Sequence, residues 1–361
     1  MTLRIDITGL PSDGLRFAAS PLAELTAMLH VLAAPAHHPQ LAGWAADVRS
    51  VLSPQLAERL QEAEFLWRSS QADFLLPARP RSTLARELDD VDRIDDDTYA
   101  TAALVTTCGS TRMRSVARSP LTDAAARERA LDLAQARGAR QEAFAERLLA
   151  DPAAVRARVR HTLEQCAEAF FDAAWTGAAA QLAADLRLKN DLLKHQGIGA
   201  ALASVSGAIA LAADGACITV DKLQDKATAA HPGGITFIPS VFNSPHLVVV
   251  HAPGWQPVVQ YPVAEPDPPR QVPLETVELR LEALSHPLRL RLLRTLARGP
   301  HTTGELAHAW ELTPPEVSRH LAVLRRAGLL TAQRQGRYIH YALNLPALTA
   351  LGTDLLAAVL R

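Results

Sequence analysis

Polar and basic side chains gather between residues 313 and 338 of the 361-residue chain. They belong, together with one proline, to Thr313, Pro315, Ser318, Arg319, His320, Arg325, Arg326, Arg334, Gln335, Arg337 and Tyr338. Guanidinium and hydroxyl groups hydrogen-bond to phosphate oxygens and to base edges, which is the chemistry of double-stranded DNA recognition. Contact with DNA requires one continuous surface. Whether these residues can bind DNA therefore depends on the helices and strands that carry them.

Capping signals divide this region into two short helices. Thr302 and Glu305 have the spacing of a capping box, which opens the first helix. Thr313 and Glu316 repeat that spacing, and Pro314 suits the first helical position, so a second helix begins after a turn of only a few residues. Two short helices joined in this way predict a helix-turn-helix.

The second helix is predicted to have an apolar face and a small, basic face. At about 100° per residue, Val317, Leu321 and Leu324 form one stripe. The opposite face carries Pro315, Ser318, Arg319, Ala322 and Arg326. Small residues allow a helix to enter a major groove about 12 Å wide, so we expect Ser318 and Arg319 to reach base edges. Arg325 and Arg326 are placed for the phosphate backbone.

Beyond Gly328 the apolar residues alternate, which predicts a β-hairpin. Its strands are Leu329–Gln333 and Tyr338–Leu343, and Ile339, Tyr341 and Leu343 share one face. Arg334 and Arg337 in the connecting turn are predicted phosphate or minor-groove contacts, the alternative being ordinary solvated turn residues.

Four segments carry a family resemblance. They are 284–293 (LSHPLRLRLL), 305–307 (ELA), 317–330 (VSRHLAVLRRAGLL) and 336–343 (GRYIHYAL). Together they closely resemble the ArsR/SmtB winged-helix regulators. The resemblance implies a homodimer, formed in that family by the first and last helices, here about Leu274–Leu284 and Pro346–Leu360. It also implies binding to palindromic operators, usually as a repressor that releases DNA when an effector binds.

Metal sensing is a common property of that family, but the expected ligands are missing here. Residues 307–310 read AHAW where a thiolate pair would lie, and residues 346–361 contain neither His nor Cys. Transition metals need such ligands at matched spacing, so the sequence predicts no metal and no cofactor, and leaves an unidentified small molecule as the effector. His37, His38, His246 and His251 are interpreted as surface or packing residues.

Charge and composition agree with a basic module on an acidic body. Residues 271–361 contain 11 Arg and 7 acidic residues, whereas the preceding residues contain 26 basic and 31 acidic residues. A basic module favours a polyanionic partner. Three dispersed cysteines and a charged N-terminus predict a cytoplasmic protein, and the uncharged 196–213 stretch is too rich in small residues to predict membrane contact.

The preceding residues, 1–263, are predicted to form a mainly helical body with a small antiparallel sheet. Predicted helices are Leu22–Leu32, Pro54–Trp67, Asp123–Leu149 and Pro152–Leu193, and predicted strands are Leu3–Ile7, Cys217–Val220, Ile235–Ile238, Leu247–Val250 and Val258–Tyr261. A proline-rich linker follows at 264–273, and the winged helix-turn-helix occupies 274–361. The fold class is therefore mainly α with small β elements.

No catalytic motif is evident in the body. It resembles a little-studied domain that precedes this module in some regulators of the family, on residues 233–242 (GGITFIPSVF), Pro257 and 261–262 (YP). That resemblance assigns no chemistry, and we expect a regulator, not an enzyme. Two alternatives stay open: an enzyme fused to an autoregulatory DNA-binding tail, and a winged helix that binds protein.

Overall fold

The computed structural model describes residues 2–11, 13–68, 71–109, 118–206, 208–221, 226–244, 246–263, 274–335, 338–352 and 354–355. The chain divides into two compact units, Met1–Ala264 and Glu265–Arg361. Each unit has its own apolar core. The predicted linker 264–273 lies outside the described residues.

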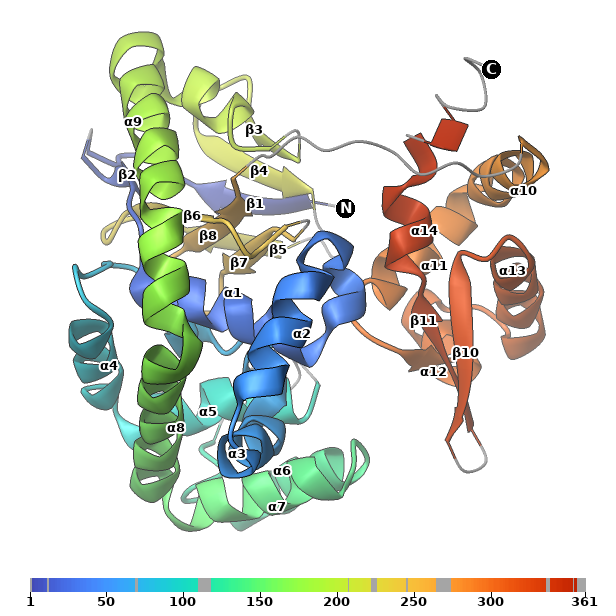
Figure 1. The fold of residues 1–361 in the computed structure, drawn as a ribbon, viewed down its shortest axis with the longest axis horizontal. Coiled ribbons are helices and arrows are strands. Elements are labelled where there is room, and N and C mark those ends of the chain that lie inside the picture. The colour runs from blue at the N-terminus through green and yellow to red at the C-terminus, as the bar shows by residue number, and fades with distance from the viewer. Residues whose placement is uncertain are drawn as a thin grey trace. The chain divides into compact units, whose positions relative to one another are not determined.

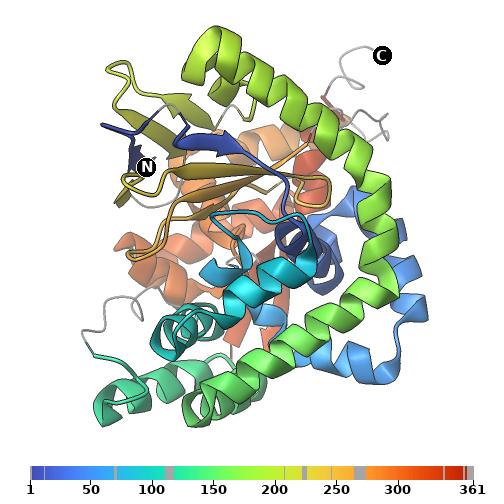
Figure 2. The same cartoon turned by 90° about the vertical axis from the view of Figure 1, so that its left-hand side faces the viewer.

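Helices make up most of the N-terminal unit. They are α1 (Pro21–Ala33), α2 (Ala42–Val51), α3 (Pro54–Ala63), α4 (Leu84–Asp92), α5 (Asp96–Thr107), α6 (Ala124–Gln135), α7 (Ala139–Ala150), α8 (Pro152–Cys166) and α9 (Asp172–Ala203). Figures 1 and 2 show α8 and α9 running the length of this unit, with its strands at one end and α3, α6 and α7 at the other. In the described residues, no helix is long and apolar enough to cross a membrane.

Two predicted helices are interrupted. The predicted helix Asp123–Leu149 is broken after Gln135, where α6 ends, and the chain returns as α7 after Gly138, whose φ is 142°. The turn allows Ala130 of α6 and Phe144 of α7 to enter the same core. The predicted helix Pro152–Leu193 contains a π-helical turn at Ala167–Phe171, and the helical segment extends to Ala203 with a kink at Gly197, whose φ is 84°. Its predicted inward face is confirmed, because Val155, Val159, Leu163, Cys166 and Phe170 are all buried.

The strands of the N-terminal unit form two mixed sheets. A single antiparallel sheet was predicted there. One has the order β3 (Ile209–Leu211), β4 (Cys217–Asp221), β1 (Thr2–Asp6), β5 (Lys226–Ala229), and the other β2 (Leu15–Phe17), β6 (Ile235–Ser240), β8 (Val258–Pro262), β7 (Val248–Val250). β1 lies parallel to β5, and β6 lies parallel to both β2 and β8. Every residue of β6 is buried, as expected for a strand between parallel neighbours.

Buried polar groups join α1 to the second sheet. The Gln260 side-chain amide donates to the carbonyl of Ala23 at 2.9 Å. The backbone amide of Val241 donates to the Glu24 carboxylate, also at 2.9 Å. Because unpaired polar groups are costly in a core, these bonds fix α1 against the middle of β8 and the residue that follows β6.

The C-terminal unit is a small helical bundle with a three-stranded antiparallel sheet. It comprises α10 (Leu274–Leu284), α11 (Pro287–Leu296), β9 (His301–Thr302), α12 (Thr303–Trp310), α13 (Pro314–Arg326), β10 (Leu330–Gln335), β11 (Tyr338–Leu343) and α14 (Leu345–Thr349). The strand order is β10, β11, β9. α10 matches the predicted first helix, and Figure 1 shows the β10–β11 hairpin projecting from the helices.

Candidate DNA-binding surface

The helix-turn-helix is formed by α12 and α13. At the start of α12 the predicted capping box is confirmed: the Glu305 amide donates to the Thr302 hydroxyl at 3.2 Å, and the Thr302 amide donates to the Glu305 carboxylate at 2.8 Å. Glu311 ends the helix in the left-handed conformation, with a φ of 55°. The Trp310 indole donates to the Thr295 hydroxyl at 3.0 Å and ties α12 to α11.

The second predicted capping box does not form, although Thr313 is the N-cap residue of α13. A cap bond needs a free amide at the second or third helical position. Pro315 lacks that amide, and the amide of Glu316 donates to the Thr313 backbone carbonyl at 3.1 Å. The exposed side chain of Thr313 therefore stands at the beginning of α13 without a capping role.

The two faces of α13 are as predicted. Val317, Leu321 and Leu324 are each 0% exposed and pack into the core of the unit. The opposite face is exposed along its whole length, at Pro315, Ser318, Arg319, Ala322 and Arg326, and Arg325 is exposed beside it. One buried stripe therefore orients a surface of small and cationic side chains.

His320 lies at the border of these two faces and is half-buried. Its ring centroid is 4.8 Å from that of His286, the N-cap residue of α11. Burial, with smaller contributions from His286 and Arg289, lowers the pKa of His320 below its usual value. The lowered pKa favours the neutral imidazole.

The predicted wing is formed by β10 and β11. Their antiparallel register runs from Leu330 opposite Leu343 to Gln335 opposite Tyr338. Arg334 consequently lies on β10 and not in the turn, where we placed it, and Arg334, Gln335 and Tyr338 are all exposed. Arg337 lies outside the described residues.

The predicted inner face of the wing is only partly packed. Tyr341 and Leu343 contact the core, whereas Ile339 is 46% exposed. Ile339 pairs with Arg334 near the end of the hairpin, and β10 is exposed from Thr331 to Gln335. The end of the hairpin therefore presents Ile339 beside the guanidinium group of Arg334, and Tyr338 beside the side-chain amide of Gln335.

Comparison with known families assigns both units. Residues 1–267 match a family of unknown function (DUF5937), and residues 286–332 match the bacterial regulatory proteins of the arsR family. The chain belongs to the DUF5937 family and carries an arsR-family module in its C-terminal unit. It is a DNA-binding transcriptional regulator of the ArsR type.

Individual relatives match the C-terminal part of the chain. The Biofilm growth-associated repressor of Agrobacterium fabrum is 36% identical over 93 residues, 24% of this chain and 80% of that protein. The transcriptional repressor SdpR of Bacillus subtilis is 35% identical over 63 residues, 18% of this chain and 70% of that protein. The solved structure of HlyU from Vibrio cholerae is 30% identical, covers 22% of this chain and 91% of its own, and has a TM-score of 0.20.

Proposed function

We propose that this regulator is a homodimeric repressor that binds a palindromic operator through α13 and the wing. The observation that carries the proposal is the continuous exposed face of α13, whose small residues and arginines lie opposite a fully buried stripe. Ser318 and Arg319 at the N-terminal part of that face read base edges, and Thr313 and Pro315 adjoin the DNA. Arg325, Arg326 and Arg334 contact phosphates, with His320, Gln335, Arg337 and Tyr338 completing the interface.

Apolar side chains on α10 support the dimer. Leu279 and Leu281 are 40% and 41% exposed, although Val277 and Ala283 of the same helix are buried. Apolar surface left in water on a helix is a candidate interface. α10 is anchored to the end of the chain by an ion pair between Arg280 and Asp354, with an N–O distance of 2.8 Å and both side chains largely buried. In the proposed dimer, these elements form the contact between protomers.

Two buried carboxyl groups of the N-terminal unit have structural partners. Burial raises the pKa of Glu24 and of Glu87 to about 7. Both groups accept hydrogen bonds from backbone amides: Glu24 from Val241, and Glu87 from Leu22 and Arg81. These carboxylates therefore support the start and the flank of α1, which is a structural role.

Titration of the full-length protein with the duplex upstream of its own gene tests the proposal. We expect saturable binding that resists excess competitor DNA, a complex containing two chains, and an affinity that falls steeply with salt. A transcription assay from the same promoter should show repression. A correctly folded protein that binds no duplex at low salt would instead support a protein-binding winged helix. In the proposal the protein works in the cytoplasm, and the effector is an unidentified small molecule, because the C-terminal unit lacks the metal ligands expected from the family resemblance.

A further inference from the structure

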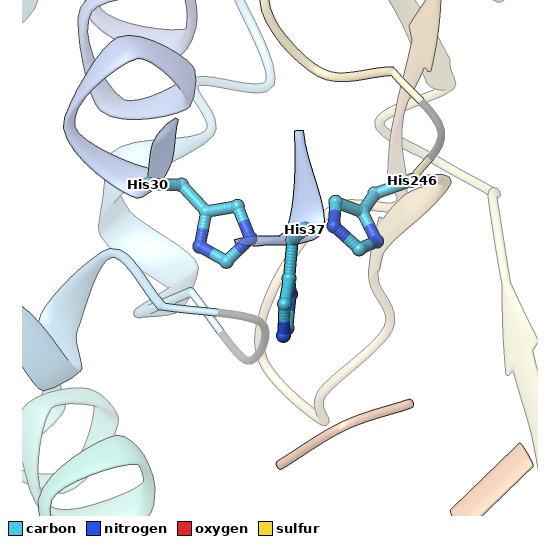
Figure 3. Close-up of side chains that lie close together, drawn as sticks. All are labelled: His30, His37 and His246. Carbon is cyan, nitrogen blue, oxygen red and sulfur yellow. The ribbon is translucent and has the colours of Figure 1, made fainter. Parts of the chain in front are cut away.

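Four histidines of the N-terminal unit meet at one place. His30 lies in the last turn of α1, His37 ends a short 3-10 turn (Pro35–His37), His38 follows it, and His246 precedes β7. The His30 ring centroid lies 5.6, 4.9 and 5.1 Å from those of His37, His38 and His246, respectively. Figure 3 shows three of these rings, His30, His37 and His246, gathered around a common centre.

We propose that this cluster is a binding site for a divalent transition-metal ion such as Zn²⁺, with His30, His37 and His246 as ligands. One ring nitrogen from each of the three lies within 4.8 Å of the others. Among the described residues, this is the only set of three or more candidate ligands that close together. Imidazole is a preferred ligand of zinc, copper and nickel, and three histidines with an open fourth position are a known zinc ligand set.

The hydrogen bonding of the cluster supports a ligand. Both ring nitrogens of His30, Nδ1 of His37 and Nε2 of His38 are buried without a hydrogen-bond partner. His30 and His38 are only 3% and 2% exposed. A buried polar atom left unpaired is destabilising, whereas an apolar side chain would fill the same space without that cost. Coordination of a metal offsets this cost.

The surrounding backbone holds the imidazoles in place. His246 is fixed by reciprocal bonds with the buried Asn243: its amide donates to the Asn243 carbonyl at 2.6 Å, and the Asn243 side chain donates to its carbonyl at 2.9 Å. His38 Nδ1 lies 2.6 Å from the Ser244 carbonyl. That contact requires a proton on Nδ1 and leaves Nε2 as a lone-pair donor, the arrangement common around metal-bound histidines. His38 therefore lies beside the proposed ligands with its own ring orientation fixed.

The cation that acts on His37 has its own counter-ion. Arg68 is paired with Glu64 at an N–O distance of 3.2 Å. Ligand nitrogens around tetrahedral Zn²⁺ lie about 3.4 Å apart, so binding draws these rings closer together.

Metal analysis of the untagged, full-length protein tests the site. After chelator treatment and dialysis, the protein is loaded with Zn²⁺ alone, and bound zinc per chain and affinity are measured by elemental analysis and by competition with a chromophoric chelator. We expect one Zn²⁺ per chain, and at least tenfold weaker binding for His37→Gln and for His246→Gln. His161→Gln, an exposed histidine on α8, is the matched control and should bind like the wild type.

Thermal unfolding gives a second readout. Zn²⁺ should raise the Tm of the wild type and of His161→Gln, and this rise should be absent from the His37→Gln/His246→Gln double variant, whose circular dichroism shows whether it is folded. No zinc binding by the wild type, or equal zinc binding by the folded double variant, would overturn the proposal. The proposal would also be overturned if blocking the three cysteines removed as much zinc as the histidine double substitution does, since thiolates would then be the ligands.

Discussion

The carboxylate of Glu24, on α1, accepts a hydrogen bond from the backbone amide of Val241, 217 residues further along the chain. Glu24 is 1% exposed, and its other carboxylate oxygen is buried without a hydrogen-bond partner. Burial is the largest cause of its raised pKa, and the bonds to Ser240, Val241 and Phe242 lower it by less. The burial of this carboxyl group therefore makes the stability of the N-terminal unit depend on pH.

The Glu24→Gln variant should flatten this pH dependence. The pKa rises from about 4.5 in the unfolded chain to about 7 in the fold, so between these values the folded state holds a proton that the unfolded chain has released. The free energy of unfolding of the wild type consequently falls as pH rises through this window and levels off above it. The Glu24 contribution is of the order of 3 kcal/mol.

Urea unfolding between pH 4 and pH 8 measures the effect. The difference in unfolding free energy between the wild type and Glu24→Gln separates the contribution of Glu24 from that of Glu87. Exposed Glu58→Gln on α3 is the control and should follow the wild type. A difference between wild type and Glu24→Gln that stays constant across this range would contradict the assignment.

A second prediction concerns the turn of the helix-turn-helix. Glu311 has a φ of 55°, which costs a residue with a side chain about 1–2 kcal/mol. Glu311→Gly removes this strain. Glycine also raises the backbone entropy of the unfolded state, which destabilises the fold by about 0.5–1 kcal/mol. We therefore expect a net gain of roughly 0.5–1 kcal/mol in the free energy of unfolding. Glu311→Gln removes the same charge without relieving the backbone and should give no gain. Equal stabilisation by both variants would show that charge, not backbone strain, is responsible.

Local signals in the sequence predicted the C-terminal unit well. α10 and the buried stripe of α13 agree with prediction, because capping residues and helical periodicity act over a few neighbouring positions. The sheets of the N-terminal unit were predicted wrongly. β1 pairs in parallel with β5 across more than 200 residues, and β2 has only three residues, so no local pattern reports their pairing.

The histidine cluster shows the same limit. His30, His37 and His38 fall within nine positions, which was an available signal, but His30 was not singled out. His246 joins them only through the packing of the segment before β7 against α1 and the turn after it. Their proximity therefore depends on tertiary structure, and the sequence alone favoured packing or surface roles.

A third prediction separates base reading from phosphate contact on α13. Arg319→Ala should lower affinity for the specific operator about tenfold or more and change binding to unrelated duplexes little. Arg326→Ala should weaken binding to every duplex and lower the slope of log K against log salt by about 1. Fluorescence anisotropy at several salt concentrations measures both effects. Arg129→Ala on α6, exposed in the other unit, is the control, and an equal loss for both α13 variants on all sequences would refute this division.

The last prediction concerns the proposed dimer. In a Leu279→Asp/Leu281→Asp variant, two exposed leucines of α10 are replaced by carboxylates, which are costly to bury in an apolar interface. We expect light scattering to show a shift from dimer toward monomer, and operator affinity to fall because one chain contacts one half-site. Val51→Asp on α2 is the matched control, since Val51 is 70% exposed in the N-terminal unit.

Circular dichroism checks that the double variant is folded, and the buried Val277 and Ala283 of α10 are unchanged in it. An unchanged dimer mass for the folded variant would place the interface elsewhere. Dissociation by Val51→Asp alone would assign it to the N-terminal unit. Loss of the dimer only on substitution of Leu279 and Leu281 would instead establish α10 as the contact that pairs two recognition helices on one operator.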